Sequence, residues 1–289
     1  SFLLQFFKLY IYKLINKKHY LYISGSDSEI NHFTNFSSEF AIIKNIKLIK
    51  SLTDISNQFG KISVIIFNKN EKYKEINKTY PKLEIEKYSP FRWSEKYLNR
   101  IPSNYLTSDL FNKNDWFVNS DSFQWRLKRF GDIAISILII IFSLPLIIIF
   151  SLLIWLEDKG PIFYSQIRTG LNGKEFKITK LRTMKQKAEL YGAVWASKYD
   201  KRITKIGYFL RRTRMDELPQ LFSVLFGDMS LIGPRPERPE IEITLKENIP
   251  HYDLRNLIKP GLSGWAQVNY PYGASIKDSK IKLSYELFY

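Results

Sequence analysis

The sequence predicts an α/β N-terminal unit followed by a mainly α, membrane-associated domain with a re-entrant helical hairpin. In the first part of the chain, short β-branched and aromatic runs alternate with helix-like stretches, as they do in α/β folds. Further on, the segment from Ile133 to Leu156 carries no charge. It is long enough to cross ~30 Å of hydrocarbon as a helix and has no recurring polar face.

The N-terminal runs alternate as in a parallel three-layer α/β unit. The strand candidates are Tyr20–Ser24, Phe40–Ile43 and Ile62–Phe67, and the helix candidates are Ser28–Phe36 and Leu52–Phe59. From Lys69 to Asn119 the sequence is rich in Lys, Asn and Tyr with weak periodicity, so we expect the end of this domain and a linker there. The predicted domains are a Rossmann-like α/β domain with its linker over residues 1–122, and a second domain over residues 123–289.

Gly25-Ser26-Asp27 follows the first predicted strand, where a nucleotide-binding fold has its phosphate loop. The pattern G-x-G-x-x-G is absent from this position, so dinucleotide binding is disfavoured. A small regulatory or packing domain is the better interpretation of this unit.

The apolar segment has Pro145 at its centre. A proline removes a backbone hydrogen bond and clashes with the preceding turn, so we expect a sharp kink or break, where Ser143 can satisfy one freed group. Lysine and arginine lie on both flanks, and positive charge favours the cytoplasmic side. A helix that enters, breaks at Pro145 and returns to the same leaflet satisfies both flanks, whereas a simple span satisfies one. The sequence therefore predicts a re-entrant membrane helix over residues 133–156.

The chain is strongly basic, with a formal net charge of +16. This excess suits an anionic lipid surface or phosphate-bearing substrates. Nucleic acid is the rival partner, but no RNP, zinc-finger or helix-turn-helix pattern occurs.

The chain has no cysteine, which excludes disulfides and thiolate zinc sites, and its three histidines are far apart without ligand spacing. It opens at Ser1 instead of methionine, so we expect it to be a fragment.

Two apolar runs after the membrane segment, Pro161–Gln166 and Phe176–Leu181, flank Asn172-Gly173. Asn-Gly is a strong type I′ turn signal, so we expect a β-hairpin. The hairpin carries a set of basic side chains, namely Arg168, Lys177, Lys180 and Arg182. They form either a solvated face or a phosphate-binding fringe, and their spacing does not decide between the two.

The block from Arg211 to Glu237 combines two acids with several arginines. Pro219 is tolerated only in a first helical turn, which predicts Asp216 at the N-cap and Glu217 just after it. The expected apolar face of this helix is Leu218, Leu221, Phe222 and Leu225. Acids at a helix start also favour the positive end of the macrodipole, which gives a purely structural alternative.

The basic residues around this helix favour a reactive site over that alternative. Arg211, Arg212 and Arg214 crowd the same turn, and Arg235 lies between two prolines in a G-P-R-P loop. The planar fork of arginine suits phosphate, and a carboxylate among arginines should be strongly ionised. Such a carboxylate can attack phosphorus, hold a divalent cation, or do both.

The segment Lys259–Val268 (KPGLSGWAQV) is rich in glycine and contains a proline. It is either a turn packed by Trp265 or a loop that lines a substrate, and both interpretations stay open.

Four blocks in this order resemble the monotopic phosphoglycosyl transferases, the bacterial sugar transferases that start exopolysaccharide, O-antigen and capsule assembly. The blocks are KRFGD before the apolar helix, GPIFYSQIRTGLNGKEFKITKLRTM, RRTRMDELPQLFSVLFGDMSLIGPRPE and KPGLSGWAQV. The match covers about residues 124–289, and its motifs are specific to this family. The N-terminal unit resembles the extra cytoplasmic domain of the larger, bipartite members.

This resemblance implies a two-step transfer of a sugar phosphate from a UDP-sugar to polyprenyl phosphate, at the cytoplasmic face of the bacterial inner membrane. The family's Asp-Glu pair falls on Asp216 and Glu217. Asp216 would be the nucleophile, forming an aspartyl phosphosugar and releasing UMP, and both acids would be ligands of Mg²⁺. The implied phosphate-binding residues are Arg211, Arg235, Lys180 and Arg182, and the implied membrane break is at Ser143 and Pro145. The expected partners are the membrane and these substrates, with no nucleic acid and with homodimerisation left open.

The chain departs from the family pattern at two positions, neither of which removes a reacting group. Leu144 stands directly before Pro145, where the family often has serine, and Arg214 stands where many members have a small Ser or Thr.

A different class of function also stays open, namely a membrane-anchored basic protein that binds anionic lipid or nucleic acid without catalysis. A third alternative is a Mg²⁺-dependent phosphohydrolase whose aspartyl intermediate reacts with water. The sequence does not select the sugar, beyond a mild lean to hexoses.

Overall fold

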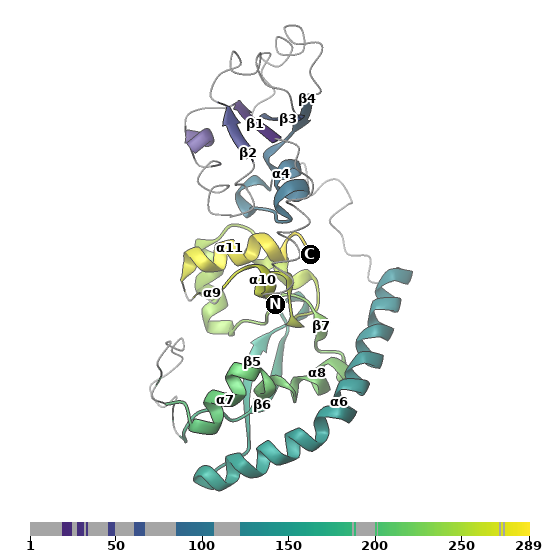
Figure 1. Ribbon diagram of the computed structural model, residues 1–289, viewed down its shortest axis with the longest axis vertical. Helices are drawn as coiled ribbons and strands as arrows, with labels where there is room; N and C mark the ends of the chain where they lie inside the picture. Colours follow the sequence, from purple (N-terminus) through teal and green to yellow (C-terminus); the bar gives the residue numbers. More distant parts are fainter. Residues whose placement is uncertain are drawn as a thin grey trace. The chain divides into compact units, whose positions relative to one another are not determined.

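The computed structural model describes residues 19–24, 28–31, 33, 46–49, 61–66, 85–106, 122–186, 188, 200, 202–271, 273 and 275–289 (Figure 1). The chain divides into two compact units. Unit 1 is Ser1–Leu106 with Phe288, and unit 2 is Thr107–Leu287 with Tyr289. The linker in which we expect the domain boundary lies mostly outside the described residues, so the boundary at residue 122 stays a prediction.

Unit 1 contains a four-stranded parallel sheet in the order β2-β1-β3-β4. The strands are β1 His19–Ser24, β2 Ile46–Ile49, β3 Lys61–Ile66 and β4 Ile85–Tyr88. Strands β1 and β3 confirm two of the three predicted strands, and the start of the predicted helix at Ser28 is helical. The predicted strand Phe40–Ile43, the predicted helix Leu52–Phe59 and the loop Gly25-Ser26-Asp27 lie outside the described residues. The Rossmann-like assignment of this unit therefore stays a prediction.

The end of unit 1 is more regular than its weak sequence periodicity indicated. Helix α4 (Pro90–Trp93) begins after Ser89, whose side chain accepts a hydrogen bond from the Arg92 N–H at 3.2 Å. Pro90 occupies the first turn, where its missing N–H costs nothing. Trp93 is fully buried and packs in one cluster with Phe33 of the preceding helical segment and Leu98. This cluster closes one side of the unit, which short-range periodicity does not reveal.

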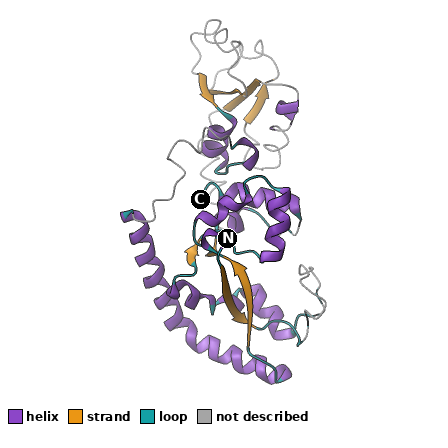
Figure 2. Cartoon of the chain, turned by 180° about the vertical axis from the view of Figure 1, so that it is seen from behind, coloured by secondary structure: helices purple, strands orange, loops and turns teal. Residues whose placement is uncertain are grey.

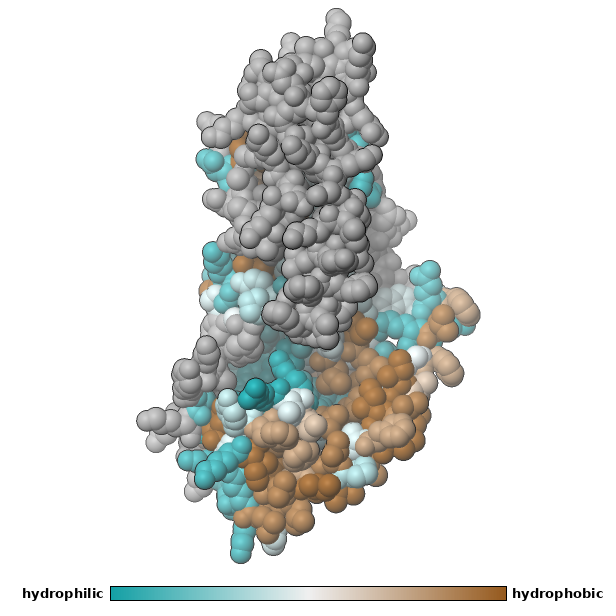
Figure 3. Space-filling view, in the orientation of Figure 1, coloured by the Kyte–Doolittle hydropathy of each residue, from teal (hydrophilic) through white to brown (hydrophobic). Residues whose placement is uncertain are grey.

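Unit 2 begins with helix α6 (Phe123–Asp158), the one helix in the described part of the chain that is long and apolar enough to cross a membrane. Only a narrow stripe of α6 is buried, and its members are Asp132, Ser136, Ser143, Ile147 and Ile154. The remaining apolar side chains are exposed, and Figure 3 shows them as a broad hydrophobic surface. A helix with this surface is not a core helix of its own unit, and an apolar patch of this kind is typical of membrane association.

Helix α6 is bent at its middle and is not interrupted at Pro145. The helix runs continuously from Phe123 to Asp158, and Figure 1 shows that its two halves point in different directions. The Ser143 hydroxyl donates to the Ile140 carbonyl at 3.4 Å, so it does not replace the N–H that the proline removes. A single missing N–H weakens one turn and permits a bend without ending the helix. The structure therefore shows one bent helix at this position. A re-entrant hairpin that returns to the same leaflet stays a prediction.

A β-hairpin follows α6, as predicted, with antiparallel strands β5 (Phe163–Thr169) and β6 (Glu175–Leu181). Asn172 and Gly173 have φ of 54° and 76°, and the Lys174 N–H donates to the Leu171 carbonyl at 3.1 Å. Positive φ at both central residues is the signature of a type I′ turn, so this prediction is confirmed.

Helices α7 (Lys205–Thr213) and α8 (Gln220–Phe226) pack between the hairpin and α6 (Figures 1 and 2). One core cluster joins Ile147 and Ile154 of α6 to Leu181 of β6 and Leu210 of α7. Burial of each such side chain contributes about 1.5–3 kcal/mol. The inner stripe of α6 is therefore fixed to the domain while its outer faces stay exposed.

The remainder of unit 2 is a small helical cap on a short parallel strand pair. Strands β7 (Ser230–Ile232) and β8 (Gly261–Ser263) pair in parallel. Between and after them lie α9 Pro239–Asn248, the 3₁₀ segment η8 Tyr252–Leu257, α10 Trp265–Asn269 and α11 Ile276–Glu286. A cluster of Leu245, Ile249, Tyr252 and Leu283 holds α9, η8 and α11 together. The described structure thus agrees with a mainly helical second domain that carries small sheets.

Candidate functional site

The Asp-Glu pair lies in a tight turn between α7 and α8. Arg214, with φ of 62°, ends α7 in the left-handed region, and the 3₁₀ turn η7 (Met215–Glu217) begins directly after it. Asp216 is therefore inside this turn, and the residue in the N-cap position of α8 is Pro219. The predicted N-cap role of Asp216 is wrong, because the reversal at Arg214 starts a helical turn earlier than the proline indicates.

The buried face of α8 also differs from the predicted one. Leu221 and Val224 are fully buried, whereas Phe222 is 41% exposed. The buried residues of α8 are Gln220, Leu221, Ser223 and Val224, and the helix packs on α6, β6 and β7, which sequence periodicity alone does not report.

Asp216 is a buried carboxylate, and one of its oxygens has no hydrogen-bond partner among the described residues. The residue is 5% exposed, and no donor among the described residues reaches its Oδ1 atom. Burial and the neighbouring charge of Glu217 raise the pKa of Asp216, while Lys180 and Arg211 act in the opposite direction. This net shift runs against the expected strong ionisation of the carboxylate, and its ionisation state stays a prediction. A buried, unpaired oxygen of this kind is costly and is typical of a functional position.

Glu217 lies beside Asp216 but in a different electrostatic environment. Arg235 donates to it at 2.6 Å (Nη2 to Oε1) and 3.4 Å (Nη1 to Oε2), and Arg214 donates to Oε1 at 3.3 Å. Burial alone would raise the pKa of Glu217, but the charge and hydrogen bond of Arg235 outweigh it, so the pKa is lowered. Glu217 is the strongly ionised member of the pair.

Lys180 reaches the same site from strand β6. It lies opposite Tyr164 in the hairpin, with its ammonium 5.4 Å from the centre of the Tyr164 ring. Burial lowers the pKa of Lys180 to about 8, with Asp216 acting in the opposite direction and Arg211 and other arginines adding to the decrease. Of the two interpretations of the basic hairpin, the phosphate-binding fringe fits Lys180, whereas Lys177 on the same strand is exposed.

Arg211 is positioned by the end of β6. Its Nε donates to Thr183 Oγ1 at 2.8 Å, across the junction between the hairpin and α7. Gly207 makes this junction possible, because a Cβ there would lie 2.1 Å from the Thr183 carbonyl oxygen. The close approach brings the last turn of α7, with Arg211, next to the carboxylate pair.

Arg182 is not brought to the carboxylate pair. Its guanidinium is buried and forms an ion pair with Asp158 at the end of α6. Arg182 follows the last residue of β6, Leu181, so strand alternation does not place its side chain beside that of Lys180. Arg182 joins the hairpin to α6, and its predicted role as a phosphate ligand is untested.

The G-P-R-P loop is held by the segment that contains Lys259–Val268. Gly233 donates its N–H to the Ser263 carbonyl at 2.9 Å, and Gly261 donates to the Pro234 carbonyl at 2.8 Å. A Cβ on Gly233 would lie 2.3 Å from the Lys259 carbonyl oxygen, so only glycine permits this approach. The segment is therefore neither only a turn nor a simple lining loop: its strand β8 fixes the loop that carries Arg235.

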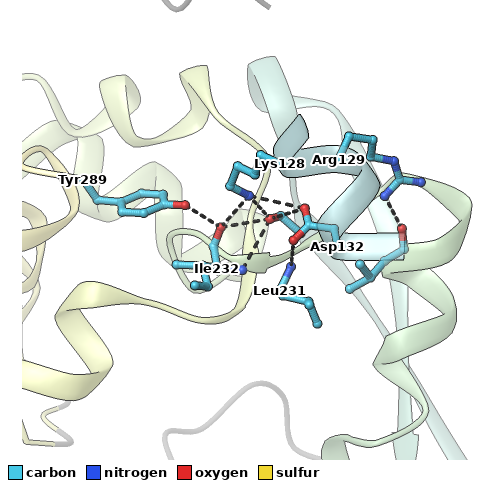
Figure 4. A network of polar contacts seen from close by, with 8 residues as sticks. Lys128, Arg129, Asp132, Leu231, Ile232 and Tyr289 are labelled. Atoms are coloured by element: carbon cyan, nitrogen blue, oxygen red, sulfur yellow. Dashed lines mark hydrogen bonds and ion pairs between the residues drawn. The ribbon is translucent and has the colours of Figure 1, made fainter. Parts of the chain in front are cut away.

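A second polar network attaches the start of α6 to this region, as Figure 4 shows. Asp132 accepts hydrogen bonds from the Ser230 hydroxyl at 2.7 Å and the Leu231 N–H at 3.3 Å, and Lys128 bonds to both Asp132 and Ser230. Arg129 donates to the Val224 and Leu225 carbonyls at the end of α8, at 2.6 Å and 2.9 Å. KRFGD is one of the four blocks that carry the family resemblance, and its side chains Lys128, Arg129 and Asp132 form contacts within the protein.

The site fits a cation that needs few protein ligands. Among the described residues there is no group of three or more His, Cys, Asp or Glu side chains that could hold a metal ion. Mg²⁺ is commonly bound by one or two carboxylates together with substrate phosphates and water. Asp216, with its unpaired Oδ1, and Glu217 fit that donor set.

These observations define a membrane-associated domain with a buried acidic pair among basic side chains, an arrangement suited to phosphate groups. Residues 123–289 match the family model described as bacterial sugar transferase. The chain therefore belongs to the bacterial sugar transferases, which confirms the resemblance of its motifs.

Three relatives illustrate the similarity. The UDP-N-acetylgalactosamine-undecaprenyl-phosphate N-acetylgalactosaminephosphotransferase of Aeromonas hydrophila is 42% identical over 163 residues, covering 56% of this chain and 38% of the relative. The UDP-glucose:undecaprenyl-phosphate glucose-1-phosphate transferase of Escherichia coli (strain K12) is 41% identical over 143 residues, covering 50% of this chain and 31% of the relative. The exopolysaccharide production protein PSS of Rhizobium leguminosarum bv. phaseoli is 36% identical over 169 residues, covering 56% of this chain and 84% of the relative. The chain thus spans less than half the length of the first two.

Proposed function

We propose that this chain transfers a sugar-1-phosphate from a UDP-sugar to polyprenyl phosphate through a covalent intermediate on Asp216. The observation that carries the proposal is the buried Asp216 carboxylate, whose Oδ1 has no partner among the described residues. The charges of Lys180 and Arg211 act on it, and Arg235 is paired with the adjacent Glu217. The names of the relatives supply the substrate classes.

In the first step, a carboxylate oxygen of Asp216 attacks the phosphorus that bears the sugar. The bond from that phosphorus to the oxygen bridging to the uridine phosphate breaks, and UMP leaves with the electron pair. In the second step, a phosphate oxygen of polyprenyl phosphate attacks the same phosphorus. The bond to Asp216 then breaks, which restores the carboxylate and gives polyprenyl diphosphosugar.

The basic side chains have a defined part in both steps. Lys180, Arg211 and Arg235 bind the phosphate oxygens and stabilise the charge that develops on them. The positive charges of Lys180 and Arg211 favour the ionised form of Asp216, which burial and the neighbouring Glu217 disfavour. Mg²⁺, held by Asp216 and Glu217, would neutralise phosphate charge when bound. Arg182 is a second candidate for phosphate contact, although its guanidinium is paired with Asp158.

Helix α6 is proposed to enter the bacterial inner membrane from the cytoplasmic face and to return to that same face. Its bend at Pro145 and its basic flanks support this topology, and the buried stripe holds the catalytic part against the helix. The lipid phosphate and the soluble sugar nucleotide would then meet at the membrane boundary. The N-terminal Rossmann-like domain over residues 1–122 and homodimerisation remain predictions without an assigned role.

The central test is Asp216→Asn. We expect this change to lower UMP release from UDP-N-acetylgalactosamine or UDP-glucose by at least about 10³-fold, because the amide is not a nucleophile. Membrane association should be unchanged. The matched control is Asp228→Asn, an exposed acid just after α8, which should retain activity.

Trapping with a donor labelled in the sugar phosphate distinguishes the alternatives. A label on the peptide that contains Asp216, released by polyprenyl phosphate, supports the transferase. Free sugar phosphate without acceptor indicates a phosphohydrolase, and salt-sensitive lipid or nucleic-acid binding without UMP release indicates a binding protein. Full turnover by Asp216→Asn would rule out the proposed nucleophile.

A further inference from the structure

The G-P-R-P loop is fixed through its carbonyl groups. Pro234 and Pro236 have no N–H, so the loop forms few of the backbone hydrogen bonds that usually determine loop shape. Arg235, between them, carries the guanidinium that contacts Glu217 at 2.6 Å. The position of this guanidinium therefore depends on what holds the neighbouring carbonyls.

Four successive carbonyls, from Pro234 to Glu237, each accept a hydrogen bond, and the donors come from β5, η8 and β8. The Gly261 N–H donates to Pro234 at 2.8 Å, and the Thr169 N–H donates to Glu237 at 2.9 Å. The other two donors are side chains, Arg255 Nη2 to the Arg235 carbonyl at 2.7 Å and Arg168 Nη1 to the Pro236 carbonyl at 3.0 Å. Arg255 therefore binds the carbonyl of Arg235, the residue whose side chain contacts Glu217.

Arg255 itself has little freedom to move. Its Nε and Nη2 donate to the two carboxylate oxygens of Glu286 at 2.8 Å and 2.9 Å, and its Nη1 donates to the Tyr252 hydroxyl at 2.9 Å. The side chains of Arg255 and Glu286 are 3% and 6% exposed. A guanidinium fixed on all three nitrogens in a buried site acts as a rigid support, which the point charge of a lysine does not reproduce.

We propose that Arg255 and Glu286 are positioning residues for the sugar-phosphate transfer, which act through the main chain of Arg235. The pair links α11 and η8 to the loop and determines where the Arg235 guanidinium meets the substrate phosphate. This inference rests on the proposed function. Neither side chain touches the reacting atoms, so their effect depends entirely on Arg235.

The test is a double-mutant cycle on UMP release from the UDP-sugar that the wild type uses. Arg255→Lys keeps the charge but loses the bidentate pair and the carbonyl contact, so we expect kcat to fall about 10–100-fold. With Arg235→Ala already present, the same change should cost no more than about twofold. Equal losses in both backgrounds would show that Arg255 acts on stability alone, and would overturn the inference.

Arg202 provides a matched control. It donates to both oxygens of Asp200 at 2.8 Å and 2.6 Å and to the Ala188 carbonyl at 3.1 Å, so it shares with Arg255 a bidentate carboxylate pair and a carbonyl contact. Arg202→Lys should leave kcat within about twofold of the wild type. If Arg255→Lys does not fold, Glu286→Gln replaces it, because this isosteric change weakens the pair and leaves Arg255 in place.

Hydrogen exchange separates failure of this inference from failure of the proposed function. The amides of Gly261 and Thr169, which donate to the Pro234 and Glu237 carbonyls of the loop, should exchange at least about tenfold faster in Arg255→Lys or Glu286→Gln than in Arg202→Lys. This readout needs no turnover, so it remains valid if the wild type releases no UMP from any UDP-sugar. Unchanged exchange of these two amides would overturn the positioning role even in an active transferase.

Discussion

Asp216 and Glu217 are adjacent acids, but their pKa values are shifted in opposite directions. The pKa of Asp216 is raised by burial, and the pKa of Glu217 is lowered because Arg235 outweighs burial. The difference arises from which oxygens have a donor, not from sequence position. The carboxylate with the raised pKa is the more basic of the two, which fits the proposed roles of Asp216 as nucleophile and of Glu217 as its support.

The pH dependence of donor use should report Lys180. Burial lowers the pKa of this ammonium to about 8, so it is a cation below that pH and loses its proton as the pH rises. If the cation binds phosphate, kcat/KM for the UDP-sugar should fall about tenfold for each pH unit well above 8, since kcat/KM reports groups of the free enzyme.

Two variants on one strand identify the source of this dependence. Lys180→Arg keeps a permanent charge and should remove the fall at high pH. Lys177→Arg, on the exposed face of β6, should retain it. A fall that persists unchanged in Lys180→Arg would exclude Lys180 as its origin.

At the scale of elements, the membrane helix and the catalytic turn are one assembly. The buried stripe of α6 packs on α7 and α8, and the network around Asp132 attaches its first turns to β7 (Figure 4). The basic flanks predict the cytoplasmic side, and this stays a prediction. Lys128 and Arg129 also form protein contacts that attach the start of α6 to β7 and α8.

Arg129→Gln should destabilise this junction. The end of α8 would lose a charged donor to the Val224 and Leu225 carbonyls, so we expect the free energy of unfolding to fall by about 1–2 kcal/mol. Chemical unfolding in detergent measures this loss. Arg126→Gln, an exposed position one turn earlier, should change the stability by less than about 0.5 kcal/mol, and equal losses would contradict the proposed contact.

At the scale of the whole molecule, the topology of α6 is the main open prediction, and the chain is suited to test it. It has no cysteine, so single cysteines can be placed without removing native ones. We expect Arg126→Cys and Lys159→Cys, exposed positions at the two ends of α6, to react with a membrane-impermeant maleimide from the same face. Labelling from opposite faces would establish a true span and refute the re-entrant helix.

Local rules sufficed for part of the fold. The type I′ turn at Asn172-Gly173, the hairpin and the apolar helix follow from short-range geometry, and strands β1 and β3 follow from β-branched and aromatic runs. The phase of α8 and the continuity of α6 through Pro145 did not follow. Both depend on neighbouring elements, because α8 packs on α6, β6 and β7, and because the buried stripe holds α6 on both sides of Pro145.

By itself, the sequence determined the family, the acidic pair, the basic residues and the membrane-associated helix, because these depend on residue types at fixed spacing. Only the tertiary structure decided which of these residues meet. It brings Lys180, Arg211 and Arg235 around the pair and directs Arg182 to Asp158. It also reveals Arg255 and Glu286 behind the loop, 31 residues apart along the chain. Burial and charge pairing act across space, so they emerge only when the chain has folded.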